Sequence, residues 1–225
     1  MGGNGVRSFT PRRGRNGSVW TGNLNPYTPE TLKEALGEKG KPFGIADSVV
    51  KTNPHFNPGT SEFSENCQRC VVAYELRRRG YDVTALPTYK GDVLPRVAYH
   101  DSKRGTWEGR WKGAFKGAKT LNVGVRGNNS SAEQKVINNI EQKMKDFGSG
   151  SRGVVQIFYR GGGGHVFNVE NVGGQIRYME AQTGQAKNIS QTMSRVDTSS
   201  VNLVRTDNLH ISDRAKKFVT RKGRR

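Results

Sequence analysis

Cysteine is scarce in this chain: only Cys67 and Cys70 occur among 225 residues, too few for a disulfide framework. No run of about 18 apolar residues is present, so the sequence excludes a transmembrane helix and no membrane partner is expected. The N-terminal sequence MGGNGVRSFTPRRGRNG contains no apolar stretch of the kind that serves as a secretory signal. We therefore expect the protein to act in a bacterial cytoplasm, inside a virion, or after export by a machine that needs no signal peptide.

Acidic residues are also few. The chain has 19 Asp and Glu against 37 Lys and Arg, a formal net charge of +18, which attracts polyanions. Basic residues form a run near each end, and neither run is interleaved with aromatic residues for base stacking. We expect these two tails to contact DNA, RNA or another polyanion without sequence preference; their basic residues are Arg7, Arg12, Arg13, Arg15, Arg214, Lys216, Lys217, Arg221, Lys222, Arg224 and Arg225.

Composition divides the chain into three predicted segments. Residues 1–60 are rich in Gly, Pro, Asn and Arg and indicate a basic, partly disordered extension with one short helix, which Thr28-Pro29-Glu30 begins. Residues 61–212 form one folded domain, and residues 213–225 a basic tail. Inside the domain, the Gly-punctuated stretch 101–119 contains Trp107 and Trp111 and is expected to be a loop or a partner surface.

Hydrophobic periodicity predicts helices over residues 67–79 and 131–147, each ended by a glycine. A capping box at Ser130 or Ser131 begins the second helix. Strands are expected over 81–86, 154–159, 165–171, 175–180 and 201–205, with a Gly173-Gly174 turn joining the third and fourth strands. A helix followed by a mostly antiparallel sheet makes the predicted fold class α+β.

A cysteine at the start of a helix lies in the positive end of the helix dipole, which favours the nucleophilic thiolate. Cys67 is the first residue of the predicted helix and follows Asn66, a residue type that caps helices. His165 begins a strand directly after the glycines 161–164, which leave room for a substrate backbone, and it is the best-placed base. Glu180 ends the paired strand and is the candidate that orients the imidazole. Gln182, just beyond it, is a candidate orienting or hydrogen-bonding group.

Other chemistries fit the same residues less well. C-x-x-C at a helix start also occurs in thiol redox proteins, but no βαβ pattern surrounds this pair. Two cysteines and a histidine could bind zinc, but no second ligand pair has zinc-finger spacing. The glycines 161–164 lack the Lys-Ser/Thr and the following helix of a phosphate-binding loop. We therefore expect no metal and no cofactor.

Two separated motifs resemble the papain-fold toxin family, also called Tox-PL or glutamine-deamidase-like papain-fold toxins. The first is ENCQRCVVAYELRRRGYDVTALP, over residues 65–87. The second is GHVFNVENVGGQIRYMEAQTG, over residues 164–184, in which a histidine opens a strand and an acidic residue precedes Q-T-G. The resemblance covers about residues 60–210. Similar domains occur in bacterial polymorphic toxins and in phage head-associated proteins.

The resemblance implies a papain-like cysteine hydrolase fold for residues 61–212, with an N-terminal catalytic helix. It implies Cys67 as nucleophile, His165 as base and Glu180 as orienting acid. The family usually has Asp at the last position, so the longer Glu180 needs a shifted strand end or a water to reach the same nitrogen. Papain itself has C-x-x-C with the second cysteine catalytic, which would select Cys70; the helix-end position favours Cys67.

The function expected from these features is hydrolysis of a carboxamide by a thiolate, with backbone N–H groups and the Asn66 side chain holding the oxyanion. With a protein glutamine as substrate this is deamidation by a toxin, effector or phage-carried factor. A narrow mouth framed by residues 161–164 and by Trp107 and Trp111 would favour it, with Gln182 orienting the carboxamide. The alternatives are a cysteine protease, or a non-enzymatic basic virion- or nucleic-acid-associated protein on a papain-like scaffold. An immunity protein or phage head proteins are the expected partners besides the substrate.

Overall fold

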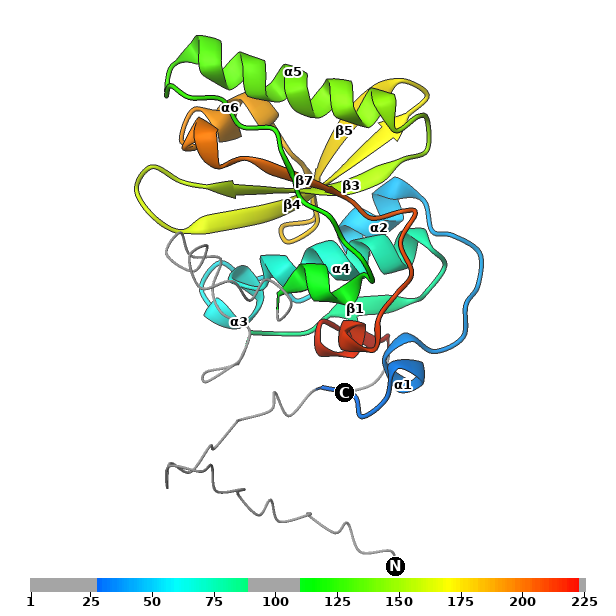
Figure 1. The fold of residues 1–225 in the computed structure, drawn as a ribbon. Helices are drawn as coiled ribbons and strands as arrows, with labels where there is room; N and C mark the ends of the chain where they lie inside the picture. The colour runs from blue at the N-terminus through cyan, green and yellow to red at the C-terminus, as the bar shows by residue number, and fades with distance from the viewer. Residues whose placement is uncertain (1–27, 89–109, 223–225) are drawn as a thin grey trace, which may run out of the picture.

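A six-stranded antiparallel sheet lies at the centre of the protein, with helices on both of its faces (Figure 1). The computed structural model describes residues 28–88 and 110–222. In chain order the elements are α1 (Leu32–Leu36), α2 (Ile45–Lys51), α3 (Ser61–Ser64), α4 (Cys67–Arg78), β1 (Val83–Ala85), η3 (Trp111–Ala114), β2 (Leu121–Asn122), α5 (Ser130–Asp146), β3 (Arg152–Phe158), β4 (Gly164–Val172), β5 (Gln175–Glu180), β6 (Gln185–Ala186), α6 (Ile189–Met193), η4 (Thr198–Ser200), β7 (Asn202–Arg205), η5 (Asp213–Lys217) and β8 (Val219–Arg221).

The strand order in this sheet is β2-β7-β3-β4-β5-β6, and every neighbouring pair is antiparallel. Alternate residues of β3 pack on opposite faces: Val154 joins the cluster around α4, and Val155 joins the cluster around α5. The strand therefore has an almost continuous apolar sequence, because both faces of the sheet are covered. The predicted α+β class with a mostly antiparallel sheet is confirmed.

Helix α4 is buried along nearly its whole length, including its charged residues. Arg77 is fully buried and contacts the carboxylates of Asp47 and Asp82, each at 2.6 Å. Glu75 is paired with both Arg79 and Arg152. Buried charges are tolerated only when they are paired in this way. These pairs connect α4 to α2, to β1 and to the sheet, so they fix the position of the helix that begins at Cys67.

The folded part of the chain begins earlier than the predicted limit at residue 61. Ala35, Leu36 and Val49, on α1 and α2, belong to the same buried cluster as α4. Helix α2 lies in a stretch where the sequence predicted no helix, since seven residues are too short to show a clear helical period. The described part of the predicted extension, residues 28–60, is therefore packed on the domain.

The C-terminal limit differs as well. Residues 213–217 form η5, and β8 pairs with β1 in a separate two-stranded sheet. Phe218 and Val219 are buried, so the described part of the predicted basic tail contributes to the core. A three-residue strand has little pattern of its own, and its pairing with a strand more than a hundred residues earlier is not visible locally.

Trp111 is 1% exposed and lies in the cluster around α4, at the start of η3. The expectation that Trp111 frames a narrow mouth at the surface is therefore wrong. Its burial offers a large apolar side chain to the core, which outweighs the polar, Gly-punctuated character of its neighbours. Trp107 lies outside the described residues.

The helix starts differ slightly from the predicted ones. Asn129 caps α5, with its side chain accepting from the N–H of Ala132, in place of the predicted Ser130 or Ser131. Thr31 caps α1 three residues after the predicted Thr28. None of the helices in the two described segments is long and apolar enough to cross a membrane.

Candidate active site

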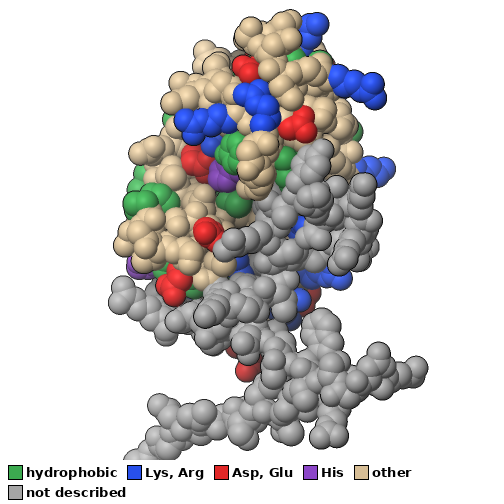
Figure 2. All heavy atoms as spheres, turned by 90° about the vertical axis from the view of Figure 1, so that its left-hand side faces the viewer, with side chains coloured by type: hydrophobic (Ala, Val, Ile, Leu, Met, Phe, Trp, Pro, Cys, Tyr) green, Lys and Arg blue, Asp and Glu red, His purple; other side chains and the backbone are tan. Residues whose placement is uncertain are grey.

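Three elements bring the predicted catalytic residues together. Cys67 is the first residue of α4, His165 is the second residue of β4, and Glu180 is the last residue of β5. In the β4–β5 pair Asn168 lies opposite Met179, so Glu180 lies opposite Phe167. His165, two residues before Phe167, is therefore diagonal to Glu180 on the same face of the sheet. Figure 2 views the side of the protein that carries the β3–β4 turn: histidine and hydrophobic side chains reach the surface there, with basic side chains above them.

His165 contacts Glu180 directly. The imidazole Nε2 lies 2.7 Å from Glu180 Oε2, a hydrogen-bond distance. A carboxylate can only accept, so Nε2 carries the hydrogen, and Nδ1 is the nitrogen left for the neighbouring Cys67 side chain. The longer side chain of Glu therefore reaches the imidazole without the water or shifted strand end that the sequence suggested.

Lys187 is a second partner of Glu180 and was not identified from the sequence. Its ammonium group forms an ion pair with Glu180 Oε2 and lies 4.8 Å from the centre of the Phe167 ring. Both side chains of the pair are only 11% exposed. Lys187 follows the short strand β6, and nothing in its local sequence distinguishes it from the many other lysines. It contacts the same carboxylate oxygen, Oε2, as the imidazole does.

The charges of this site favour an imidazolium beside a carboxylate. Burial lowers the pKa of His165, but the Glu180 charge, the hydrogen bond to Glu180 and the neighbouring Cys67 side chain raise it more, to about 9. Burial raises the pKa of Glu180, but His165 and Lys187 lower it more, to about 2. At neutral pH His165 is therefore protonated and Glu180 ionised.

The two cysteines differ in their surroundings. Cys67, 8% exposed, lies close enough to His165 to raise the pKa of the imidazole. Cys70, 2% exposed, donates its S–H to Asn66 Oδ1 at 3.3 Å. Burial, and the nearby charges of Cys67 and Glu180, raise the pKa of Cys70 well above its usual value, which keeps it a neutral thiol. Of the two candidates that the sequence left open, the geometry favours Cys67 as the nucleophile.

Asn66 has a structural role in place of the predicted oxyanion role. Its Nδ2 donates to Asn53 Oδ1 and to the Leu86 carbonyl, so the side-chain amide is not directed at a substrate. It makes no side-chain cap of α4. Gln182 is also buried, and its Nε2 lies 3.4 Å from Asn66 Oδ1, which turns the amide inward. The predicted direct contacts of Asn66 and Gln182 with substrate are therefore not supported by their contacts.

Asn53 organises this buried amide cluster. Its Nδ2 lies within hydrogen-bond distance of the carbonyls of Phe63 and Gln182, each at 2.8 Å, and 3.3 Å from Asn66 Oδ1. It thereby joins the end of α2 to the start of α4 and to the turn after β5. Sequence reasoning missed this residue because it follows a helix that was itself missed.

Among residues 28–88 and 110–222, no group of three or more His, Cys, Asp or Glu side chains is arranged to hold a metal ion.

Cys67 should react with iodoacetamide at least about tenfold faster than Cys70 at neutral pH. The reason is that Cys67 faces an imidazolium, whereas Cys70 is a buried thiol with a raised pKa. Peptide mapping after timed alkylation of the folded protein measures both rates. Faster labelling of Cys70 would reverse the assignment.

Replacing Glu180 with glutamine should lower the pKa of His165 by about one pH unit or more, because the charge that stabilises the imidazolium is lost. NMR titration of the imidazole measures this pKa in both proteins. Lys187→Met is the matched control: it removes a cation from the same carboxylate, so the His165 pKa should not fall. A His165 pKa that is the same in Glu180→Gln and the wild type would contradict the ion pair.

A cysteine at the start of a helix, facing a histidine and an acid on an antiparallel sheet, is the arrangement of the papain-like fold. Residues 65–185, more than half of the chain, match the family model "Papain fold toxin 1, glutamine deamidase", and the chain belongs to this family. The resemblance inferred from the two motifs is thereby confirmed. No curated protein and no solved structure matches the chain. The matched segment contains Cys67, His165 and Glu180, and it ends before Lys187 and α6.

Proposed function

We propose that this protein is a toxin or effector that deamidates a glutamine side chain of a target protein, with Cys67, His165 and Glu180 as its catalytic residues. The observation that supports this most directly is the position of His165 inside the segment matched by the deamidase family: its imidazole hydrogen-bonds with Glu180, and the neighbouring Cys67 raises its pKa. The nucleophile, the base and the orienting acid are therefore neighbours in the fold, as covalent catalysis requires.

In the first half of the reaction the Cys67 thiolate attacks the Cδ carbon of the glutamine carboxamide. The carbonyl π electrons move to oxygen and form a tetrahedral oxyanion. As the oxyanion collapses, the C–N bond breaks and the imidazolium of His165 gives its proton to the leaving nitrogen, which departs as ammonia. The product is a thioester on Cys67. The raised pKa of His165 keeps that proton available at neutral pH.

In the second half, neutral His165 accepts a proton from water while the water oxygen attacks the thioester carbon. The C–S bond breaks, Cys67 leaves as a thiolate, and the substrate residue becomes glutamate. The net change is glutamine plus water to glutamate plus ammonia. Glu180 accepts from Nε2–H throughout and keeps Nδ1 directed at the reaction.

The backbone N–H of Cys67 is the donor best placed to stabilise the oxyanion. It is the first N–H of α4, and it has no hydrogen-bond acceptor among the residues that the structure describes. This N–H lies at the positive end of the α4 dipole, and that end stabilises the negative charge that develops on the oxyanion. This backbone group takes the role that the sequence assigned in part to the Asn66 side chain.

Deamidation, rather than cleavage of a peptide bond, is supported by membership of the glutamine deamidase family. The sequence argument from two tryptophans at a narrow mouth does not add to it, because Trp111 is in the core.

The test is to incubate the purified protein with a bacterial lysate and with a host-cell lysate and to measure ammonia release and new α-amino termini. Protein in which the thiols have been alkylated serves as the control. Ammonia without new termini, lost after alkylation, supports deamidation. New termini that depend on the thiol would make the protein a protease. The absence of both ammonia and new termini would refute the proposal that the protein is an enzyme of this kind.

A further inference from the structure

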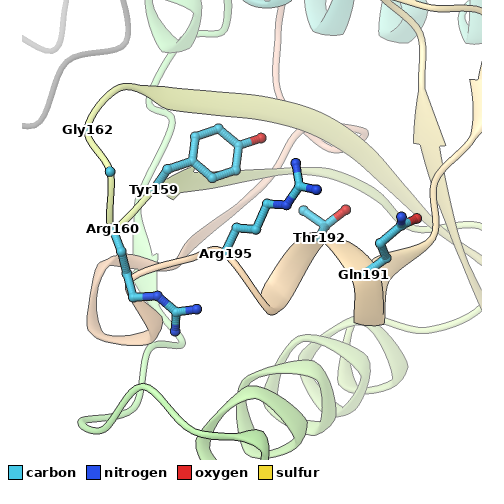
Figure 3. Close-up of a pocket in the computed structure, with 7 residues that line it drawn as sticks. Tyr159, Arg160, Gly162, Gln191, Thr192 and Arg195 are labelled. Carbon is cyan, nitrogen blue, oxygen red and sulfur yellow. The ribbon is translucent and has the colours of Figure 1, made fainter.

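The structure has a cavity of about 740 Å³ that Cys67, His165 and Glu180 do not line (Figure 3). Its lining comes from the β3–β4 turn, from α6 and from the segment after α6. The residues are Tyr159, Arg160, Gly161, Gly162, Gln191, Thr192 and Arg195. Three of them, Gln191, Thr192 and Arg195, lie beyond the segment that matches the deamidase family.

This cavity adjoins the catalytic residues through two connections. On one side, Ile157 pairs with His165 in the β3–β4 ladder, and Tyr159 follows two residues later. The pKa of Tyr159 is raised by burial and also by the charges of Glu180 and Cys67, so its hydroxyl lies within electrostatic reach of the catalytic residues. On the other side, Lys187 contacts Glu180 and leads directly into α6.

The two arginines of the cavity are in different states. Arg160 is held by the carbonyl of Ser194 and by an ion pair with Glu133 at 3.7 Å. Arg195 is exposed, and its guanidinium has no hydrogen-bond or ion-pair partner among the described residues. In Figure 3 the Arg195 side chain extends toward the space between Tyr159 and Thr192, whereas Arg160 points away. A positive charge is therefore presented to the cavity, and none of the described residues supplies its counter-ion.

The rest of the lining can complete a site for an anionic group. Gln191 and Tyr159 offer an amide and a hydroxyl donor beside Arg195, whereas the Thr192 hydroxyl donates to the Asn188 carbonyl. A guanidinium presents parallel N–H donors that match the two oxygens of a carboxylate. Gly161 has open space where a side chain would project, so the turn leaves this wall of the cavity free.

We propose that this cavity binds an acidic side chain of the protein substrate, an Asp or Glu close to the target glutamine, through Arg195. The inference rests on the proposed function, since it assigns the substrate class of the same site. An acidic target also agrees with the net charge of +18, which accelerates encounter with acidic surfaces. Specificity for the target would then be carried by α6 and Arg195, outside the family-matched segment.

The test uses short peptides with one glutamine and one glutamate, the glutamate placed at successive positions on either side of the glutamine. Matched peptides carry methionine in place of glutamate. The best glutamate peptide should have a kcat/KM for ammonia release about tenfold above its methionine partner, the ratio that about 1.4 kcal/mol of differential binding gives. In Arg195→Ala this ratio should fall to about one. Arg177→Ala, which removes another exposed arginine of the sheet outside the cavity, should leave the ratio at about ten.

A binding measurement separates this inference from the proposed function. The dissociation constants of the labelled peptides are measured with Cys67→Ala, alone and combined with Arg195→Ala or with Gly161→Leu, which fills the open wall of the cavity. Glutamate peptides should bind more tightly than methionine peptides, and Arg195→Ala and Gly161→Leu should each abolish this difference. That outcome supports the cavity site even if no peptide releases ammonia. The absence of ammonia release would refute only the deamidase proposal. Ammonia release without a glutamate preference, or a preference that survives Arg195→Ala, would overturn the cavity proposal and leave the deamidase intact.

Discussion

Replacing Cys67 with alanine should lower kcat for ammonia release by about 10⁴-fold or more, the effect seen when a covalent nucleophile is removed from a catalytic triad. The thioester cannot form without the sulfur, and no other nucleophile takes its position, since Cys70 is directed at Asn66. Substrate binding should change little, because the loss is confined to one atom. Steady-state ammonia release with the best peptide or protein substrate measures the effect.

The matched control for this prediction is Cys70→Ala, three residues further along α4. Cys70 contributes one hydrogen bond to Asn66, and its removal should leave kcat within about tenfold of the wild type. If Cys70→Ala were inactive and folded while Cys67→Ala remained active, the nucleophile would be Cys70, as an alignment with the C-x-x-C of papain would suggest.

Replacing His165 with alanine should lower kcat by about 10³- to 10⁴-fold, because the reaction then lacks both the acid for ammonia departure and the base for water attack. The domain should remain folded. Glu180 keeps its ion pair with Lys187 when the imidazole is removed, so no buried charge is left without a partner. Kinetics and a thermal unfolding curve of the same variant measure the two effects separately.

The informative control here is Lys187→Met, which removes the other partner of Glu180 and leaves the imidazole in contact with the carboxylate. It should retain far more activity than His165→Ala. A folded His165→Ala variant with wild-type kcat would show that His165 is structural and would remove the triad.

The sequence predicted which residues the candidate site brings together better than it predicted their surroundings. Cys67, His165 and Glu180 lie at the ends of a helix and two strands whose periodic patterns are long enough to place those ends. Lys187 and Asn53 could not be found in this way, because each meets its partners across the fold and follows an element too short to be recognised.

The limits of the domain were missed for a related reason. The pairing of β8 with β1 and the packing of α1 and α2 on α4 join segments that are distant in the chain, and such contacts leave little local pattern. Trp111 shows the same limitation in one residue: a polar, glycine-rich neighbourhood indicated a surface loop, while tertiary packing placed its ring in the core. Asn66 was recognised as important, but its amide is used for holding Asn53 and Leu86.

The most direct test of the proposed chemistry is peptide-level mass spectrometry of a target protein treated with the enzyme in ¹⁸O-labelled water. Hydrolysis through a thioester on Cys67 predicts glutamate in place of one glutamine, one ¹⁸O in the new carboxylate, an unbroken backbone, and none of these changes with Cys67→Ala. Two results would contradict the proposed chemistry. One is new peptide termini that carry ¹⁸O while the glutamines stay unchanged, and the other is glutamine-to-glutamate conversion that persists with Cys67→Ala.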